Sequence, residues 1–261
     1  MSDKVLVEQL GHVLLVTLNR PEARNAVDLD VCVGVGEAVE RAEADSDIRV
    51  LVLTGAGDQA FCAGVDLKAL SRGEIMLPPG REHWSFAGFV NHFTSKPTIA
   101  AVNGNALGGG TELALACDLV VAVESANFGL PEVKRGLVAA AGGAFRLGRQ
   151  LPHRVALELL LTGRPLPAPD ALRWGLINRV VGAGEVLSAA LELAEEIASN
   201  APLAVQVSKR LAYGVADAIR PEEQELWQLN DLLFSQIMRS ADALEGPRAF
   251  AEKRAPIWLG H

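Results

Sequence analysis

The spacing of apolar residues changes along the chain, and each change predicts a different element. Residues 4–10 and 13–18 alternate between apolar and polar or run apolar, which predicts two strands joined by a turn at Gly11-His12. Asp28 precedes a run with helical spacing that continues to about Ala44. An aspartate in that place is typical of a helix start, so the chain is expected to open with a hairpin followed by a helix.

The middle of the chain alternates between strands and helices. Apolar runs predict strands in "RVLVLTGAG" from Arg49, in "TIAAVNG" from Thr98 and in "DLVVA" from Asp118. Helices are predicted over Phe86–Thr94 and after Gly109. Because strands that alternate with helices are usually parallel and covered on both faces, this order indicates the α/β class.

The sequence after Arg146 is mostly helical in its spacing. One further apolar strand is expected at Ile177–Val181, and Pro202 and Pro221 occupy positions where a first-turn proline begins a helix. No repeat of fixed period is present. The successive strand, turn and helix units are compatible with an irregular spiral, which the pattern alone leaves open.

Composition narrows the class of protein further. The chain has 261 residues, 49% hydrophobic and only 5% aromatic, which fits one large domain, or one domain with an appendage, with a core of Ala, Val and Leu. A formal net charge of −8 argues against nucleic acid as a bulk partner. Cys32, Cys62 and Cys117 fit neither a disulfide framework nor a paired-cysteine zinc site.

The N-terminus carries no basic segment followed by an apolar one, and no apolar run has transmembrane length. We therefore expect a cytoplasmic protein with no membrane partner. His83, His92 and His153 are interpreted as structural, because no ligand spacing joins them. Residues 71–97 contain four of the aromatic side chains, which suits either the wall of a pocket or an amphipathic helix over the core.

The stretch "NALGGGTELALACD" carries the first candidate chemistry. Three glycines, Gly108 to Gly110, lie where a strand turns into a helix whose first N–H groups lack partners within the helix. Glu112 lies one turn along on the same face as Gly109, so a free donor and a carboxylate face one region. The alternative is a capping glutamate beside glycines that serve tight packing. The stretch lacks the lysine of a phosphate-binding loop.

Two other loops also carry a candidate backbone donor or carboxylate at a helix start. In "FCAGVDL", a second glycine turn leads into a helix, so the Val65 N–H is a candidate second donor for a ligand oxygen. In "FGLPEVKRG", Glu132 follows Pro131, which places a carboxylate in the first turn of a helix. As an alternative reading, Asp66 and Glu132 are ordinary carboxylates at helix starts.

Taken together, five motifs resemble the enoyl-CoA hydratase/isomerase (crotonase) family: "NRPEARNA", "FCAGVDL", "AVNGNALGGGTELALACDL", "FGLPEVKRGL" and the ending "FAEKRAPIWLG". The resemblance covers nearly the whole chain. It implies an α/β crotonase-like spiral of ββα units with a C-terminal helical trimerisation layer. Residues 1–200 would form the core with the acyl-CoA site, and residues 201–261 the oligomerisation region, giving a homotrimer or a dimer of trimers.

The resemblance also implies roles for particular residues. The N–H groups of Val65 and Gly109 would form an oxyanion hole for a thioester carbonyl, with Glu112 as the base and Glu132 as the acid of a water-adding site. Adding water across a double bond needs one group to activate water and another to protonate carbon. Residues implied to bind the coenzyme A part of the substrate are Arg24, Ala26, Ala63, Asp66, Lys68 and, toward a neighbouring subunit, Lys253.

The implied function is a reversible acyl-CoA hydratase that needs no metal and no permanently bound cofactor. A double-bond isomerase and a catalytically idle scaffold that binds coenzyme A or associates with RNA are the alternatives. The run "LVAAAGGAFRL" places Ala139, Ala144 and Phe145 where many relatives have a proline and a "GGTQRL" run. Hydratases of branched, carnitine-like or ring-derived acyl-CoAs share such a run, so the acyl group stays open.

Overall fold

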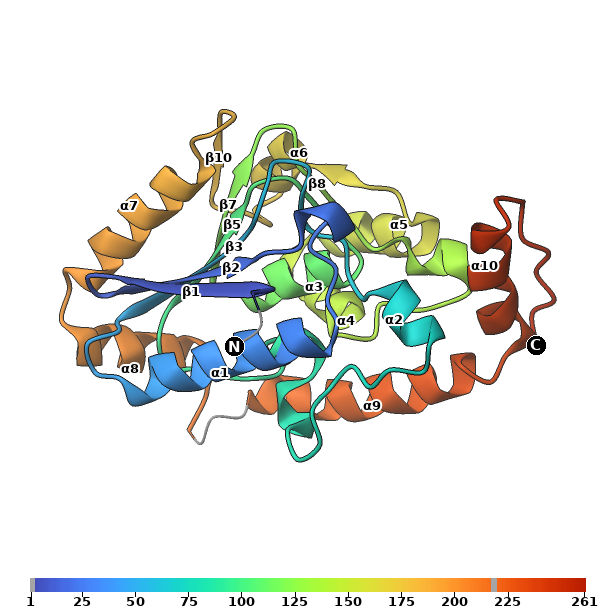
Figure 1. Cartoon of the computed structure of the whole chain (residues 1–261), viewed down its shortest axis with the longest axis horizontal. Helices are drawn as coiled ribbons and strands as arrows, with labels where there is room; N and C mark the ends of the chain where they lie inside the picture. The colour runs from blue at the N-terminus through green and yellow to red at the C-terminus, as the bar shows by residue number, and fades with distance from the viewer. Residues whose placement is uncertain (1–2, 217–219) are drawn as a thin grey trace.

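The computed structural model describes residues 3–216 and 220–261, which form two β-sheets enclosed by helices (Figure 1). The six-stranded sheet has the order β1 (Val5–Leu10), β2 (Val13–Leu18), β3 (Val50–Gly55), β5 (Thr98–Val102), β7 (Leu119–Val123), β10 (Arg179–Val181). The four-stranded sheet has the order β4 (Ala60–Cys62), β6 (Asn105–Leu107), β8 (Asn127–Gly129), β9 (Leu166–Pro167). The predicted hairpin and the predicted long strands are confirmed.

The chain adds one strand to each sheet in successive turns of a spiral. β3 and β4 are followed by α2 (Leu67–Ser71), β5 and β6 by α3 (Gly109–Ala116), and β7 and β8 by the 3-10 helix η4 (Pro131–Arg135). From β2 to β10, every neighbouring pair in the larger sheet is parallel, and only β1 is antiparallel to β2. The spiral therefore brings the starts of α2, α3 and η4 into one region.

Two helices cover the larger sheet. α1 (Leu29–Ala44) packs against β1, β2 and β3, and α7 (Val186–Ala198) packs against β2, β3, β5 and β7, from below and above in Figure 1. All residues of β3 and β5 are buried, which accounts for their continuous apolar runs. The Asp28 side chain accepts a hydrogen bond from the Val31 N–H and caps α1 as expected.

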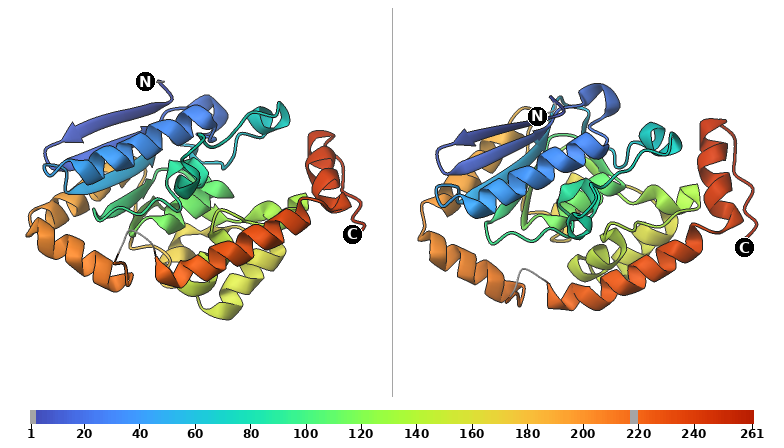
Figure 2. Two further views of the ribbon diagram at one scale, coloured as in Figure 1. Left: turned by 90° about the horizontal axis from the view of Figure 1, so that it is seen from below. Right: turned by 60° about the horizontal axis from the view of Figure 1, so that its bottom comes forward.

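The remaining helices form the rest of the C-terminal half: α4 (Gly143–Gln150), α5 (His153–Thr162), α6 (Ala168–Arg173), α8 (Pro202–Ala212), α9 (Pro221–Ile237) and α10 (Ala241–Ala251). Both first-turn prolines begin helices as predicted. Figure 2 shows α9 running along one side of the molecule and α10 standing at its far end. In the described part of the chain, none of the helices combines the length and apolarity needed to cross a bilayer.

The α-helix predicted over residues 86–94 is wrong. The segment instead contains two 3-10 turns, η2 (Glu82–Trp84) and η3 (Phe86–Gly88), with Ser85 and Ala87 at φ 57°. The reason is tertiary packing on α1, where the buried Trp84 ring lies directly on Gly36. A large ring that fits onto a glycine decides the backbone path here, and it outweighs the weak helical preference of the segment.

This packing makes a prediction about two helical glycines. A Cβ at Gly36 would overlap the Trp84 ring, whereas a Cβ at Gly148 in α4 meets nothing within 4 Å. Gly36→Ala should lower the free energy of unfolding by about 1–3 kcal/mol through overpacking. Gly148→Ala, the matched control, should raise it by up to about 1 kcal/mol through helix propensity. Denaturant unfolding measures both, and equal effects would refute the packing argument.

Candidate active site

The first turn of α3 packs directly against two neighbouring segments. A Cβ at Gly110 would collide with the carbonyl oxygen of Cys62, at the end of β4. A Cβ at Gly109 would lie 2.5 Å from the ring of Phe86 in η3. Both positions therefore require glycine, and the absent side chains let β4 and the aromatic segment approach the helix start.

Two backbone donors lie on these adjacent segments. Gly64 packs so closely on α3 that its Cβ would be 3.1 Å from the Gly109 nitrogen. Among the described residues, neither the Val65 N–H nor the Gly109 N–H donates a hydrogen bond. Val65 pairs with Val27 only through the Gly64 carbonyl and the Asp66 N–H. Gly109 also begins an eight-residue helix, whose dipole favours negative charge at this end. The Val65 and Gly109 N–H groups can therefore donate to a developing oxyanion.

Glu112 is buried, with 4% of its surface exposed, and it is held from outside its own helix. Its Oε1 accepts hydrogen bonds from the N–H groups of Ala141 at 2.7 Å and Gly143 at 2.9 Å. The side chain therefore reaches forward to the start of α4. In the structure it makes no cap for α3, which removes the main support for the capping interpretation.

Glu132 comes to the same place from η4. A Cβ at Gly108 would lie 3.0 Å from Glu132 Oε1, so the carboxyl lies against the turn that begins α3. Glu132 Oε2 is buried and has no hydrogen-bond partner among the described residues. An unpaired buried carboxyl oxygen is costly for stability, and such groups are concentrated where a protein binds or transforms a ligand.

Burial perturbs both carboxyls, and the charge of Glu132 also perturbs Glu112. Burial, and after it the charge of Glu132, raises the pKa of Glu112 to about 8, although the Gly143 and Ala141 N–H groups oppose the shift. Burial raises the pKa of Glu132 to about 7. Near neutral pH the pair consequently holds a proton that the two carboxyls share. One carboxyl can then act as an acid while the other acts as a base.

A second loop pair borders this region. The Ala63 N–H donates to the Arg24 carbonyl at 3.1 Å, and the Val27 N–H donates to the Gly64 carbonyl at 2.8 Å. These bonds align the loop that contains Ala26 with the loop that contains Val65. A cavity of about 380 Å³ opens beside them, lined by Arg24, Gln59, Ala60, Ala63, Asn105 and Leu107. Two of the predicted coenzyme-binding residues, Arg24 and Ala63, therefore line one hollow.

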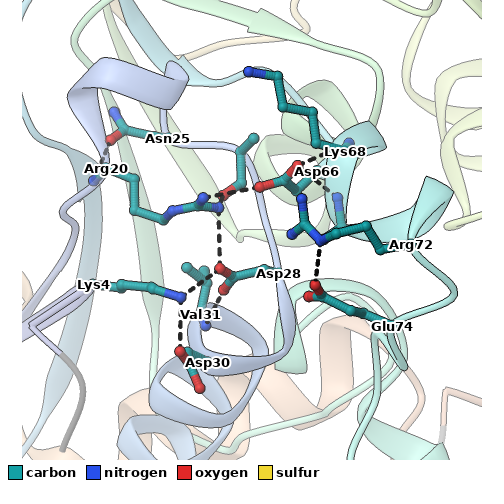
Figure 3. Close-up of polar contacts among 12 residues, drawn as sticks. Lys4, Arg20, Asn25, Asp28, Asp30, Val31, Asp66, Lys68, Arg72 and Glu74 are labelled. Atoms are coloured by element: carbon teal, nitrogen blue, oxygen red, sulfur yellow. Dashed lines mark hydrogen bonds and ion pairs between the residues drawn. The ribbon is translucent and has the colours of Figure 1, made fainter.

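Arg20 links these two loops by hydrogen bonds (Figure 3). It donates to the Ala26 carbonyl at 2.7 Å and to Asp66 Oδ2 at 2.9 Å. Asp66 Oδ1 accepts from the N–H groups of Lys68 and Ala69, so Asp66 caps α2. Both Asp66 oxygens therefore accept hydrogen bonds within the protein, as the helix-start interpretation expected. The contact of Asp66 with coenzyme A stays a prediction.

The two predicted lysines lie apart from each other. Lys68 is exposed in α2, close to the Arg20–Asp66 pair (Figure 3). Lys253 is exposed and lies two residues beyond α10, the helix that stands at the end of the molecule away from the larger sheet (Figure 1). The described chain therefore does not bring Lys253 together with the other predicted residues.

Sequence reasoning missed the groups that hold the site in shape. Neither the Ala141 and Gly143 donors nor Arg20 was expected to contribute. The buried Asn25, whose side-chain nitrogen donates to the Ala60 carbonyl at 2.8 Å, was also missed. The glycine pair in "AAAGGAF" was the available signal for a helix start with free donors. Arg20 and Asn25 lie in the motif "NRPEARNA" but gave no separate signal, because their partners Asp66 and Ala60 lie 46 and 35 positions away.

Comparison with known proteins agrees with the family resemblance of the sequence motifs. The sequence profile of the enoyl-CoA hydratase/isomerase family matches residues 8–261. The chain is 43% identical over 266 residues to a carnitinyl-CoA dehydratase of Salmonella typhi and 44% identical over 264 residues to one of Proteus mirabilis, with 100% of both chains covered in each case. It superposes on the crystal structure of a carnitinyl-CoA hydratase from Mycobacterium avium with a TM-score of 0.98, at 58% identity and full coverage of both chains.

The raised pKa of Glu112 predicts a specific dependence of stability on pH. Its folded value of about 8 lies above the ordinary 4.5, so the folded state binds the extra proton between these values. The stabilisation is complete below about pH 4.5 and is lost as the pH rises through 8. Glu112→Gln removes this titration and keeps an oxygen for the two N–H groups.

Between pH 5.5 and 7.5, the stability of Glu112→Gln relative to the parent should therefore increase by about 2 kcal/mol. Denaturant unfolding at the two pH values measures the change. An equal difference between parent and variant at both values would show that Glu112 titrates normally.

Proposed function

The chain belongs to the enoyl-CoA hydratase/isomerase family, and we propose that it is an acyl-CoA hydratase, a lyase that reversibly adds water across the 2,3 double bond of a 2-enoyl-CoA. The observation that carries this function is the pair of carboxyls, Glu112 and Glu132, whose pKa values are both raised by burial, beside two backbone donors with no hydrogen-bond partner among the described residues. Water addition requires both a base and an acid, and this site offers one of each.

The oxyanion hole has an electrostatic role. When hydroxide adds to C3, negative charge moves onto the thioester oxygen as an enolate forms. The Val65 and Gly109 N–H groups would donate to that oxygen, and the α3 dipole would add to their effect. Because these donors are fixed by backbone packing, they need no reorganisation as the charge develops.

The carboxyls would handle the protons. Glu112 takes a proton from water, the resulting hydroxide bonds to C3, and Glu132 delivers its proton to C2. Without substrate, the higher pKa of Glu112, about 8 against about 7 for Glu132, places the proton on Glu112, because burial outweighs the two N–H donors from Ala141 and Gly143. A bound water that donates to Glu112 adds a third donor, so we assign Glu112 as the base and Glu132 as the acid.

For the substrate, we propose that carnitinyl-CoA and its 2,3-dehydrated form are tested first. The curated relatives in Salmonella typhi and Proteus mirabilis are named carnitinyl-CoA dehydratases, and the Mycobacterium avium structure is named a carnitinyl-CoA hydratase. Dehydration and hydration are the two directions of one equilibrium. The run at Ala139, Ala144 and Phe145, which departs from many hydratases, is consistent with an acyl group other than a plain short chain.

Coenzyme A enters as part of the substrate. Enzymes of this family act on CoA thioesters without a metal or a permanently bound cofactor. We place the CoA moiety along the loops of Arg24, Ala26 and Ala63, near Lys68, with Lys253 reaching the substrate of a neighbouring subunit. The cavity beside Arg24 and Ala63 supports the first part of this placement. We propose the cytoplasm as the site of action.

Self-association follows from the surface of the C-terminal helices. Large apolar side chains are strongly exposed there, including Leu203 at 75%, Leu211 at 77% and Leu244 at 75%. Exposed apolar side chains of this size are typical of an interface between protein chains. We propose a homotrimer or a dimer of trimers formed through residues 201–261, with residues 1–200 as the core.

The catalytic assignment predicts large and non-additive losses. Glu112→Gln and Glu132→Gln should each lower the rate of hydration by roughly 10²-fold or more, because each removes one proton transfer. The double variant should be far less impaired than the product of the single losses, because both groups act on one water. Loss of enoyl-thioester absorbance measures the rate, and thermal unfolding with CoA titration serves as the control for folding and binding.

The same assay with a 3-enoyl-CoA separates hydration from isomerisation, in which protons move between C2 and C4. Retention of near-parental hydration by Glu112→Gln would overturn the assignment of the base. Faster turnover of the 3-enoyl-CoA than of every 2-enoyl-CoA would favour the isomerase instead.

The oligomer prediction has its own measurement. Light scattering at micromolar concentration should give the mass of three or six chains of 27.7 kDa. Substituting Leu211 and Leu244 with Glu should lower that mass, since a charge at an apolar contact is costly to bury. A stable parental monomer would refute the proposed assembly.

A further inference from the structure

Two histidines and a glutamate that are distant in sequence meet on the outer side of α1. Glu40 comes from α1, His83 from η2, and His92 from the turn that follows η3. One ligand atom of each lies within 4.8 Å of those of the other two. From the sequence, both histidines were interpreted as structural, because no ligand spacing joins them. Only the fold brings them together with Glu40. We call this group the Glu40–His83–His92 cluster.

The backbone around the cluster is fixed by close packing. Trp84 lies on Gly36 of α1, and a Cβ at Gly88 would collide with the carbonyl of Cys32 one turn earlier on the same helix. The segment of residues 82–92 is therefore pinned to α1 on both sides of η3. The positions from which the three side chains project are consequently set by the core, and only the side chains need to adjust.

His92 has the features of an oriented metal ligand. Its Nδ1 lies 3.1 Å from the Gly88 carbonyl, so the proton occupies Nδ1 and the Nε2 lone pair is free. Its ring stacks on Trp84 with a centroid distance of 5.4 Å and an angle of 12°. A carbonyl that holds one ring nitrogen while the other faces outward is the usual second-sphere arrangement of histidine ligands.

Arg81 is the competitor for this site. Its Nη1 pairs with Glu40 Oε1 at 2.5 Å, and its guanidinium lies over the Trp84 ring. The pair is partly exposed, with 44% and 39% of the two side chains accessible, so it contributes little to stability. A divalent cation bound by two imidazoles can displace Arg81 from the carboxylate, and removing Arg81 should strengthen cation binding.

We propose that the Glu40–His83–His92 cluster is a binding site for a divalent transition metal of the zinc type. Two imidazole nitrogens and one carboxylate are a ligand set that selects Zn²⁺ over Mg²⁺ or Ca²⁺. Tetrahedral coordination at 2.0–2.1 Å places ligand atoms about 3.4 Å apart. The exposed His83 and the half-buried Glu40 can close the remaining gap by rotation.

Such a metal would link segment 82–92 to α1 and leave the reaction chemistry to the carboxyl pair. The same segment contains Phe86, whose ring packs on Gly109 at the start of α3. The site is therefore structural, and its occupation would stabilise the wall beside the acyl-CoA site. This inference is independent of the proposed hydratase function.

The test uses the full-length chain without a histidine tag. Competition with a chromophoric chelator should show one Zn²⁺ bound per chain, and Mg²⁺ should not compete. His83→Ala, at an exposed position, should weaken Zn²⁺ binding by at least the roughly tenfold that loss of an outer-sphere partner costs. Glu40→Gln should weaken it similarly, whereas Arg81→Gln should strengthen it.

His153→Ala is the matched control, because His153 is also exposed but lies in α5 outside the cluster. Thermal unfolding should show that Zn²⁺ stabilises the parent and the control more than His83→Ala. Visible absorption by bound Co²⁺ provides a second readout. The His92→Gln variant should lack this absorption, whether or not the variant is also less stable. Equal Zn²⁺ affinity in the parent and His83→Ala, or less than one bound ion per chain at saturation, would overturn the proposal.

Discussion

The contact between the first turn of α3 and the backbone at the end of β4 is the constraint on which the site depends. Gly110 lies on the Cys62 carbonyl, and Gly64 lies on the Gly109 nitrogen, so two backbones approach without any side chain between them. This approach brings two unpaired N–H groups together and places Glu112 one turn behind them. Any side chain at Gly110 would move α3, and with it both the donor and the carboxylate.

The carboxyl pair shows how the fold tolerates two acidic side chains in a buried region. An isolated buried charge is prohibitively costly, so proton affinity rises until the pair retains a proton. The backbone donors at Ala141 and Gly143 offset part of the cost for Glu112, whereas Glu132 retains a buried oxygen with no described partner. The unpaired oxygen lowers the stability of the folded protein. In return, the two carboxyls already have the geometry needed for proton transfer before substrate binds.

The C-terminal helices support this geometry from two sides. Arg146 in α4 makes a bidentate pair with Glu223 in α9, at 3.0 and 2.6 Å, and also donates to the Val90 carbonyl. Removing one partner of such a buried pair costs about 3–5 kcal/mol. On the other side, a Cβ at Gly246 of α10 would collide with the Arg135 carbonyl at the end of η4. Helices far along the chain thus set the start of α4, which holds Glu112, and the path of η4, which carries Glu132.

The sequence by itself determined the six strands of the larger sheet and most helices, and it singled out Glu112 and Glu132 as the candidate reacting groups; the four-stranded sheet was not predicted. Apolar runs reveal β3 and β5 because both faces of these strands are buried, and the glycine turns before Val65 and Glu112 reveal helix starts with free donors. Local signals of this kind need no knowledge of distant residues. Only the tertiary structure decided the path of residues 82–92, where a ring packing on Gly36 overrides a helical pattern. It also decided which groups hold Glu112, and it brought Glu40, His83 and His92 together. These features depend on contacts between residues 29 or more positions apart or on separate elements, which no local spacing encodes.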